Sequence, residues 1–515
     1  MQLRDYQQKA LDRIWANMFV LQTSLCVMPC GSGKTEIIIG LIQKCLEKMP
    51  DIRIVVLVER ITLLDQTVRR IRASLPGLSV GVYGGNGSRA SYDETPFLVS
   101  TVQSIHKLQT DKINLIILDE VHHLNPKTGR YLDFIKQQSE KNPKLKIVGF
   151  TATPYNHSGY IYGPGKMFKN IVYQRNLVEM IEEDYLVPPR LKHTKEQFDV
   201  SALRVRMGEY VQEDVDKLLF DVDKVRAQIA DALPQLKDRK KVVWVCGNIK
   251  HAELVREELG ESAVTMHSKQ EQQMRAWAQY QFEKLDKKHI TNVGILTEGY
   301  DFPAIDAIVL MRPIRSPVTY VQSCGRGLRR SPGKKDCLIL DYGHVVENLG
   351  PLDDPIVVQT RGNTAAAKMK FCPTCLEFVP AATKECPICN HVFESAETSP
   401  VKNLSVKSAQ TGTLLTQKQL VEMKVESCRL SKYTSKNGNQ CLKITYNGVA
   451  SYSEFFTWNI EFGYKRASTR LLQLDVDRIS ELDQQVLQPI RNVPTHIVID
   501  ISKKYPEVIK LLWQK

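Results

Sequence analysis

The sequence predicts an α/β protein: two parallel-sheet domains in tandem, followed by a small cysteine-rich ribbon and a small α+β domain. Three observations lead to this prediction. Short apolar runs without alternation recur in two series, at 25–153 and 241–342, and such runs are typical of strands buried on both faces of a sheet. Two Cys-x-x-Cys pairs follow at 372–389. The 515 residues are also too many for one ordinary core. We expect domains at 1–189, 190–350, 368–395 and 412–515.

Each domain has its own expected elements. The first should contain helices at 35–49 and 130–141 and strands at 25–29, 52–58, 96–101, 115–120 and 146–153. The second should contain strands at 241–246, 262–267, 292–297, 307–313 and 337–342, after a helical segment at 215–233. Beyond residue 350, the polar segment 394–413 is typical of a linker. The last unit has strand composition at 441–448, 451–460 and 495–503.

Charge and cysteine usage limit the classes of protein. The formal net charge of +13 and pI near 9.0 favour a nucleic-acid partner, although dispersed charge on a soluble basic protein is the alternative. The N-terminal MQLRDYQQKALD carries acidic residues and lacks the apolar core of a signal peptide. No apolar run approaches the roughly 18 residues that a membrane span needs. Most of the twelve cysteines are scattered through apolar or helical segments. A reducing compartment, the cytoplasm, is therefore expected.

The segment MPCGSGKT at 28–35 lies between an expected strand and an expected helix. Backbone N–H groups can wrap phosphates at a helix N-terminus where the residues are small, as at Gly31, Ser32 and Gly33. Lys34 would then reach the β- and γ-phosphates, and the Thr35 hydroxyl would bind Mg²⁺. Met28 replaces the first glycine of the P-loop pattern. The prediction is an ATP site with Mg²⁺; the alternative is a glycine turn before a core helix.

The segment LIILDEVHH at 115–123 supplies the acids that such a site needs. An apolar strand that ends in Asp119-Glu120 places two carboxylates at the carboxyl edge of the sheet, where α/β proteins bind ligands. Asp119 would hold Mg²⁺, directly or through water. Glu120 would orient and deprotonate the attacking water. Acids at a strand end can also be a solvated turn, but the P-loop favours the functional interpretation.

Six motifs in order resemble those of superfamily 2 helicases and translocases: LRDYQQKA, PCGSGKT, DEVH, TATP, TEGYDFP and QSCGRGLRR. They cover residues 1–345 and resemble the branch that includes RecG, UvsW and RadD. The appended ribbon and C-terminal segment are similar to bacterial DNA-repair members of that branch. The resemblance implies RecA-like domains and an ATPase that acts on branched or single-stranded DNA in recombination or repair. It also implies a bacterial or phage-encoded, monomeric protein whose candidate partners include single-strand-binding and other repair proteins.

The resemblance assigns further residues to the nucleotide site. They are the adenine-reading Arg4, Tyr6 and Gln7, the coupling pair Thr151 and Thr153, the ribose contact Asp301, and Gln322, Arg326 and Arg329 of the last motif. The spacing of Arg326 and Arg329 would put both guanidinium groups on one helix face. A permanently charged fork suits a γ-phosphate that is losing its bond. The alternative is a basic surface helix that touches nucleic acid, although Arg330 or Arg315 could serve that purpose instead.

The resemblance also implies a backbone-binding track across both domains. Hydroxyls, amides and backbone N–H groups suit phosphate contacts that read no base sequence. The candidates are Arg60, Gln66, Ser100, Thr101, Gln103, Asn248, His251, Thr297 and Gly299. Each of them could instead be a helix cap or a polar group of the core.

The four cysteines at 371–393 are interpreted as a zinc ribbon. Two Cys-x-x-Cys pairs ten residues apart match a tetrahedral site, with Cys372, Cys375, Cys386 and Cys389 as ligands. A redox site would need one pair near a βαβ unit, and a disulfide framework would need export. So short a segment cannot fold on apolar burial alone, whereas Zn²⁺ contributes roughly 10–16 kcal/mol.

The last unit could supply selectivity for DNA structure. Aromatic and basic side chains that suit base stacking beside phosphate contacts lie close together in EFFTWNIEFGYKRASTR. They are Phe455, Phe456, Trp458, Tyr464, Lys465, Arg466 and Arg470. The alternative is that most of these aromatics form the core of a small domain.

Three functions remain open at this point. The leading one is an ATP-driven DNA helicase or translocase. The second is an RNA-directed ATPase, because a core that grips backbone does not exclude RNA. The third is a scaffold that binds nucleic acid without hydrolysis, against which Lys34, Asp119, Glu120 and Arg329 all argue by their presence.

Overall fold

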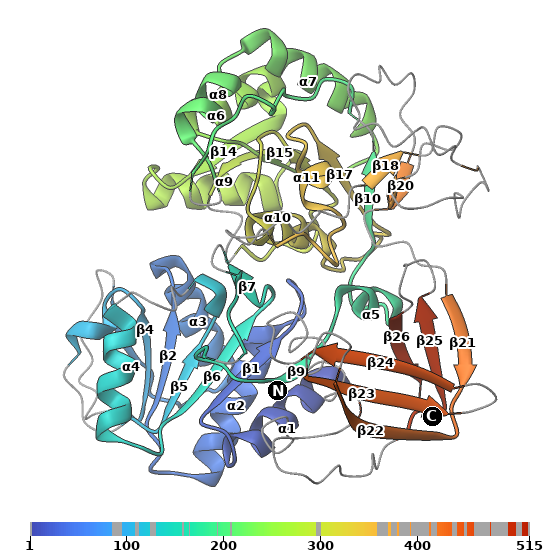
Figure 1. Ribbon diagram of the computed structural model, residues 1–515. Coiled ribbons are helices and arrows are strands. Elements are labelled where there is room, and N and C mark those ends of the chain that lie inside the picture. The colour runs from blue at the N-terminus through green and yellow to red at the C-terminus, as the bar shows by residue number, and fades with distance from the viewer. Residues whose placement is uncertain are drawn as a thin grey trace.

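A computed structural model shows how these segments fold (Figure 1). It describes residues 3–84, 95–108, 113–123, 130–156, 159–163, 165–192, 194–206, 209–294, 300–357, 369–371, 378–380, 392, 411–413, 420–434, 440–447, 451–457, 474, 493–500 and 507–512. Two α/β domains lie one above the other in this view, the first blue to cyan and the second green to yellow.

The first domain is built on a parallel sheet with the order β3-β4-β2-β5-β6-β1-β9. Its strands are β1 Thr23–Val27, β2 Ile54–Val58, β3 Gly81–Tyr83, β4 Phe97–Thr101, β5 Leu115–Leu118, β6 Lys146–Thr151 and β9 Ile171–Gln174. Every residue of β2 is buried. Alternate side chains enter two separate cores, Ile54 and Val56 on one face and Val55 and Leu57 on the other. The non-alternating apolar runs of the sequence therefore have the expected cause.

Helices cover both faces of this sheet. They are α1 Asp5–Met18, α2 Lys34–Lys48, α3 Ile61–Ser74, α4 Arg130–Lys141 and α5 Leu177–Glu182, with short 3₁₀ turns η1 Ile105–Lys107 and η2 Val121–His123. A small hairpin, β7 Tyr155–Asn156 and β8 Gly159–Tyr160, follows β6. The buried side chains of α2 belong to the same core as those of α1, whereas Phe134 and Ile135 of α4 belong to the other core.

The second domain repeats this plan with the sheet order β14-β15-β13-β16-β17-β10-β20. Its strands are β10 Pro189–Lys192, β13 Val242–Val245, β14 Ala263–His267, β15 His289–Val293, β16 Ala307–Leu310, β17 Cys337–Asp341 and β20 Thr411–Thr413. Its helices are α6 Gln212–Leu219, α7 Val222–Gln235, α8 Ile249–Leu259, η3 Gly260–Ser262, α9 Gln272–Lys284, α10 Pro317–Gly325, η4 Arg326–Leu328 and α11 Val345–Leu349; a hairpin pairs β11 Val205–Arg206 with β12 Glu209–Tyr210. The prediction of two tandem parallel-sheet domains is confirmed.

Two expectations for this domain need correction. The strand expected at 292–297 begins earlier, at His289, and ends at Val293, because Gly294 follows with a left-handed φ of 72° that interrupts an extended chain. The expected linker 394–413 is also not wholly a linker. Its last residues form β20, which pairs antiparallel with β10 and covers the polar backbone edge that β10 would otherwise expose.

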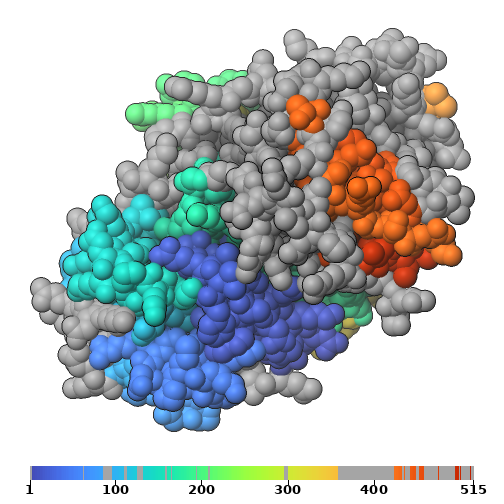
Figure 2. Space-filling view, turned by 60° about the horizontal axis from the view of Figure 1, so that its bottom comes forward, coloured from blue at the N-terminus to red at the C-terminus, as the bar shows by residue number. Residues whose placement is uncertain are grey.

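The C-terminal part contains two three-stranded antiparallel sheets, which Figure 1 shows beside the first domain in orange to red. The described residues of this part have the same colours on the surface in Figure 2. Their strands are β21 Leu420–Lys424, β22 Ser427–Thr434, β23 Gln440–Asn447, β24 Ser451–Thr457, β25 His496–Asp500 and β26 Glu507–Leu512. Leu442, Phe456 and Ile497 meet in one core. The strands expected here are present, and the described residues of 412–515 include no helix.

The cysteine module is described only in part. Strands β18 Met369–Phe371 and β19 Phe378–Pro380 pair antiparallel, and the sequence between them holds Cys372 and Cys375. All four expected zinc ligands lie outside the described residues, as do Trp458, Tyr464, Lys465, Arg466 and Arg470.

Candidate active site

The phosphate loop lies between β1 and α2, at the carboxyl edge of the first sheet. Gly31 and Gly33 have φ values of 81° and 77°, a region that side chains with a Cβ rarely adopt. A Cβ on Gly31 would also lie 2.7 Å from Cγ of Arg329. Among the described residues, the Ser32 hydroxyl is buried without a hydrogen-bond partner. The loop therefore fits a phosphate chain, which would meet the N–H groups at the start of α2.

Two residues of α1 for which the resemblance implies contact with adenine bind the backbone of this loop. The Tyr6 hydroxyl donates to the Ser32 carbonyl at 2.8 Å, and the Gln7 amide donates to the same carbonyl at 3.2 Å. Both side chains are buried. Their contact with adenine stays a prediction; the structure shows that they brace the loop.

Arg4 is exposed and lies over the ring of Tyr185, 5.5 Å from its centroid. Tyr185 also packs edge-on against Tyr6 at 4.5 Å between ring centroids. A guanidinium and an aromatic ring at the edge of the loop form a surface suited to a base. Sequence reasoning missed Tyr185, because it lies in the connection between the domains, 179 positions after Tyr6.

Lys34, Asp119 and Glu120 meet at the mouth of the loop. Nζ of Lys34 lies 3.5 Å from Oε1 of Glu120, and the Asp119 carboxylate accepts the Glu120 N–H at 2.9 Å. Burial and the Glu120 charge raise the pKa of Asp119. Burial would also raise the pKa of Glu120, but the charges of Lys34 and Arg326 outweigh it and hold that pKa below its usual value. Glu120 also has a left-handed φ of 46°, a strained conformation typical of functional positions. The acids fit a site for Mg²⁺, with Thr35 at the first turn of α2.

A buried histidine connects this acid pair to the second domain. His122 accepts a hydrogen bond from the Gln322 amide at its Nε2 (2.8 Å), and its Nδ1 lies 2.8 Å from Oγ1 of Thr151. Burial lowers the pKa of His122 to about 3, so the ring is neutral. A proton on Nδ1 satisfies both bonds, and Thr151 in turn donates to the Thr153 carbonyl at 3.0 Å. His122 belongs to the DEVH motif, but the sequence alone indicates no role for it.

Removal of this link is expected to uncouple the domains. Gln322→Ala would leave the buried Nε2 of His122 without a donor, which destabilises this contact between the domains by about 1–3 kcal/mol. We expect ATP binding to persist and the stimulation of hydrolysis by DNA to fall. Nucleotide affinity and ATPase rate, measured with and without DNA, would check this; Gln279→Ala on the exposed side of α9 is the control. Unchanged stimulation in Gln322→Ala would contradict the coupling role.

Arg326 and Arg329 converge, but not on one helix face as expected. Arg326 begins the short η4 turn, and Arg329 lies past its end in an extended conformation (φ −65°, ψ 141°). Both guanidinium groups donate to the carbonyl of Tyr300, at 3.2 Å and 2.8 Å. The i, i+3 spacing does not place both side chains on one helix face, because the helix α10 ends at Gly325, before either arginine. Gly325 packs so closely on the phosphate loop that an added Cβ would lie 2.6 Å from Cβ of Cys30.

Asp301 lies between the domains. Its carboxylate pairs with Arg329 at 3.0 Å and with Arg70 of α3 at 3.1 Å. Arg70 also lies 3.7 Å from Glu36, which follows the phosphate loop. The ribose contact expected of Asp301 stays a prediction; the structure shows that this carboxylate links the two domains.

Comparisons with known proteins agree with this geometry. Residues 1–156 match the family described as type III restriction enzyme, res subunit, and residues 224–331 match the helicase conserved C-terminal domain. The chain is 30% identical over 352 residues to the protein named as a mitochondrial ATP-dependent helicase, irc3, of Schizosaccharomyces pombe; the match covers 66% of this chain and 57% of that one. The chain therefore contains the paired domains of a superfamily 2 helicase, in the same order.

Other relatives extend the comparison. It is 27% identical over 356 residues to the ATP-dependent helicase IRC3 of Saccharomyces cerevisiae, covering 66% of this chain and 51% of that one. A 51.5 kDa protein of a Lactococcus phage is 24% identical over 381 residues, covering 72% and 78%. The chain thus spans about half the length of the yeast relatives it matches. The fragment structure of an HsdR subunit of a type I restriction enzyme from Vibrio vulnificus has the same fold, with a TM-score of 0.52, 21% identity, and coverage of 68% of this chain and 66% of that one.

Several residues expected to contact the nucleic-acid backbone have structural roles in the fold. Asn248 caps α8 by accepting the His251 N–H at 2.8 Å, and His251 is buried beneath it. The Ser100 hydroxyl is fully buried, and the Thr101 hydroxyl bonds Ser104 at 2.9 Å. These residues therefore fit the alternative interpretation, in which they are a helix cap or polar groups of the core and not contacts to phosphate.

Other track candidates are more open. Arg60 reaches across the domains to the Gly294 carbonyl at 3.3 Å, Gln103 is exposed and Gln66 is half-buried. Thr297 and Gly299 lie outside the described residues. The track as a whole stays a prediction, and Arg60 and Gln103 are its best-exposed members.

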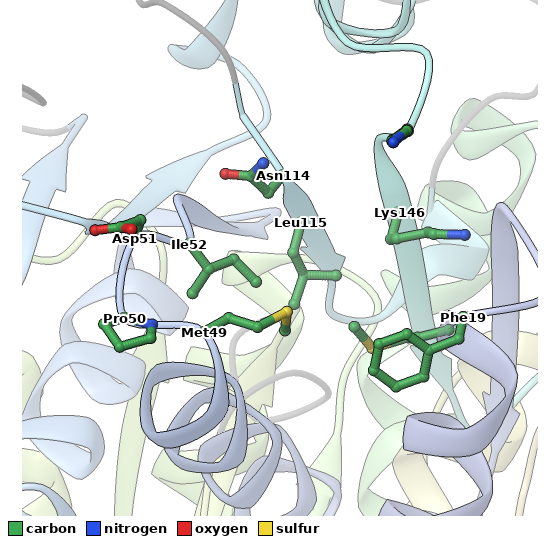
Figure 3. A pocket seen from close by; sticks show the side chains of 10 residues that line it. Phe19, Met49, Pro50, Asp51, Ile52, Asn114, Leu115 and Lys146 are labelled. Atoms are coloured by element: carbon green, nitrogen blue, oxygen red, sulfur yellow. The ribbon is translucent and has the colours of Figure 1, made fainter.

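A cavity of about 410 Å³ lies at the opposite edge of the first sheet, where the strands begin (Figure 3). Its lining is mainly apolar, with Phe19, Met49, Ile52 and Leu115 around it and Lys146 at one side. It holds none of the motif residues and lies away from the carboxyl edge that carries the phosphate loop. This cavity is therefore separate from the nucleotide site. No helix among the described residues is both long and apolar enough to cross a membrane.

Proposed function

We propose that this protein hydrolyses ATP with Mg²⁺ and uses the cycle to move along DNA. The observation that supports this best is the meeting of both domains on one loop: Lys34 and Glu120 lie on one side, and Arg329 packs on Gly31 from the other. Because both domains contribute to the site, their contacts with the nucleotide differ before and after ATP is hydrolysed. Hydrolysis can therefore open and close the two domains.

The chemistry assigns a role to each group. The oxygen of a water molecule bonds to the γ-phosphorus while the bond from that phosphorus to the bridging oxygen breaks, and the proton of the water passes to Glu120. Lys34 and the loop N–H groups hold the phosphates, and Arg329 stabilises the charge that develops on the leaving and transferred groups. Mg²⁺, held by Thr35 and Asp119, would neutralise charge on the β- and γ-phosphates.

We propose DNA, in branched or single-stranded form, as the track, and a role in recombination or repair. The motif resemblance to the RecG, UvsW and RadD branch supports this choice. The net charge of +13 favours a nucleic-acid partner of either kind. The protein would be a monomer of a bacterial or phage-infected cell, and the Lactococcus phage relative fits such an origin. RNA is the second candidate, since a mimivirus relative at 26% identity is named as an ATP-dependent RNA helicase.

One experiment separates these choices. ATP hydrolysis is measured at equal salt and equal length with single-stranded DNA, duplex DNA, forked DNA and RNA. We expect DNA, single-stranded or forked, to stimulate most. Equal or greater stimulation by RNA would favour the RNA-directed alternative, and absence of hydrolysis with every nucleic acid would favour the scaffold.

We also propose that the cysteine module binds one Zn²⁺ through Cys372, Cys375, Cys386 and Cys389. Support comes from their spacing and from the β18–β19 pairing, which brings together the chain on either side of the first pair. Metal analysis should find one zinc per chain, and Cys375→Ser or Cys386→Ser should lose it. Cys428→Ser, a half-buried cysteine of β22, is the control. Zinc content below one in the wild-type protein purified without chelator would contradict this assignment.

A further inference from the structure

Lys334 is a half-buried lysine beside the arginine motif that the roles given above do not use. Its ammonium group donates two hydrogen bonds, to the carbonyl of Arg329 at 2.8 Å and to the carbonyl of Pro303 at 3.0 Å. Pro303 follows Asp301 by two residues, so the lysine joins the two segments that carry the Arg329–Asp301 ion pair. One side chain thus holds both backbones next to the phosphate loop.

The backbone of Arg329 needs such support. It lies past the end of η4, so no helical ladder fixes it. Two backbone contacts hold this segment from one side: the Val187 N–H donates to the Leu328 carbonyl at 2.8 Å, and Leu186 forms a bridge with Arg329. Both of those contacts come from the connection between the domains. Lys334 supplies the contact on the side of the second domain.

The local fold directs the lysine back toward the arginine. Gly333 adopts a left-handed φ of 75°, and the Lys334 N–H donates to the Ser331 carbonyl at 3.1 Å. This tight turn after Arg330 reverses the chain, so that position 334 lies next to position 329. Position 335 is exposed. The two adjacent lysines therefore have different environments, which offers a matched control.

We propose that Lys334 is a positioning residue for Arg329: its ammonium group ties the backbone of Arg329 to that of Pro303 and so sets where the guanidinium meets the phosphates. This inference rests on the proposed hydrolysis of ATP. Two carbonyls require a donor with at least two hydrogens, and a charged donor forms the stronger bonds. Methionine has similar length without a donor, whereas arginine keeps both the donors and the charge.

The environment of Lys334 makes its contribution sensitive to pH. Burial lowers the pKa of Lys334 to about 8; Arg329 and Arg239 also lower this pKa, and Cys337 and Asp306 oppose them. The amine is charged below that pH and loses a proton as the pH rises through it. We therefore expect the wild-type kcat to fall between pH 7 and pH 9, because the two bonds to carbonyls weaken. An arginine at this position stays charged throughout the interval.

The test measures kcat and KM for ATP, in the presence of DNA, for the full chain carrying Lys334→Met, Lys334→Arg or Lys335→Met. Thermal melting shows whether each variant folds. Lys334→Met should lower kcat about 10- to 100-fold, as a misplaced catalytic group does, with little change in KM. Lys334→Arg should recover most of kcat and remove the fall between pH 7 and pH 9, and Lys335→Met should match the wild type.

Three results would overturn the assignment: an unchanged kcat in Lys334→Met, an equal loss in Lys335→Met, or a pH profile of Lys334→Arg identical to that of the wild type. If Lys334→Met does not fold, the pH profile of Lys334→Arg decides alone. Failure of the proposed function looks different, because the wild-type protein would then show no hydrolysis at any pH.

Discussion

The Glu120→Gln protein is expected to bind ATP with Mg²⁺ and to hydrolyse it about 10²- to 10⁴-fold more slowly than the wild type, the usual contribution of a general base. Glutamine keeps the size of the side chain, and its amide oxygen can still face Nζ of Lys34, which lies 3.5 Å from the carboxylate. It cannot take a proton from water. Binding without turnover is therefore expected, and single-turnover hydrolysis beside equilibrium binding of ATP would show it.

Glu47→Gln is the matched control for this substitution. Glu47 lies near the C-terminal end of α2, the helix that begins in the phosphate loop. It accepts a hydrogen bond from Gln43 at 2.8 Å on the surface. The same chemical change there should leave hydrolysis unaltered. Wild-type turnover in Glu120→Gln would assign the base to another group, and lost binding would assign Glu120 to holding the nucleotide.

Arg329→Ala is expected to slow hydrolysis about 10³-fold or more, as loss of an arginine finger does, while ATP affinity changes little. Burial, together with the charge of Arg326, lowers the pKa of Arg329 to about 10, so the group is still charged at neutral pH. It packs on Gly31 and pairs with Asp301, within reach of the loop. Its charge matters most when negative charge builds up on the transferred phosphoryl group.

Arg330→Ala provides the comparison. This neighbouring arginine turns away from the loop to bind Asp184 in the connection between the domains. We expect it to retain most hydrolysis. A collapse of ATP affinity in Arg329→Ala would make that residue a clamp for the bound nucleotide, and a similar loss of turnover in Arg330→Ala would point to general disturbance of the domain connection.

Local sequence predicted much of the structure around the candidate site. Gly31 and Gly33 are needed for their backbone conformation, and the apolar run 115–118 must be a buried strand, so the acids that follow it lie at the sheet edge. Interactions within a few residues determine such features. Helix termination could not be read in the same way. The spacing of Arg326 and Arg329 looked helical, but close packing of Gly325 on Cys30 and the bridge from Leu186 hold the chain extended at Arg329.

The sequence by itself therefore determined the two sheets, the loop that fits phosphate and the acids beside it, because each depends on apolar periodicity or on the chemistry of adjacent residues. Tertiary structure alone decided which distant side chains meet them. Tyr185 at the loop edge, the His122–Gln322 link and the Lys334 bond to Pro303 all join segments whose separation along the chain carries no local signal. The His122–Gln322 link in particular forms only where the two domains pack against each other.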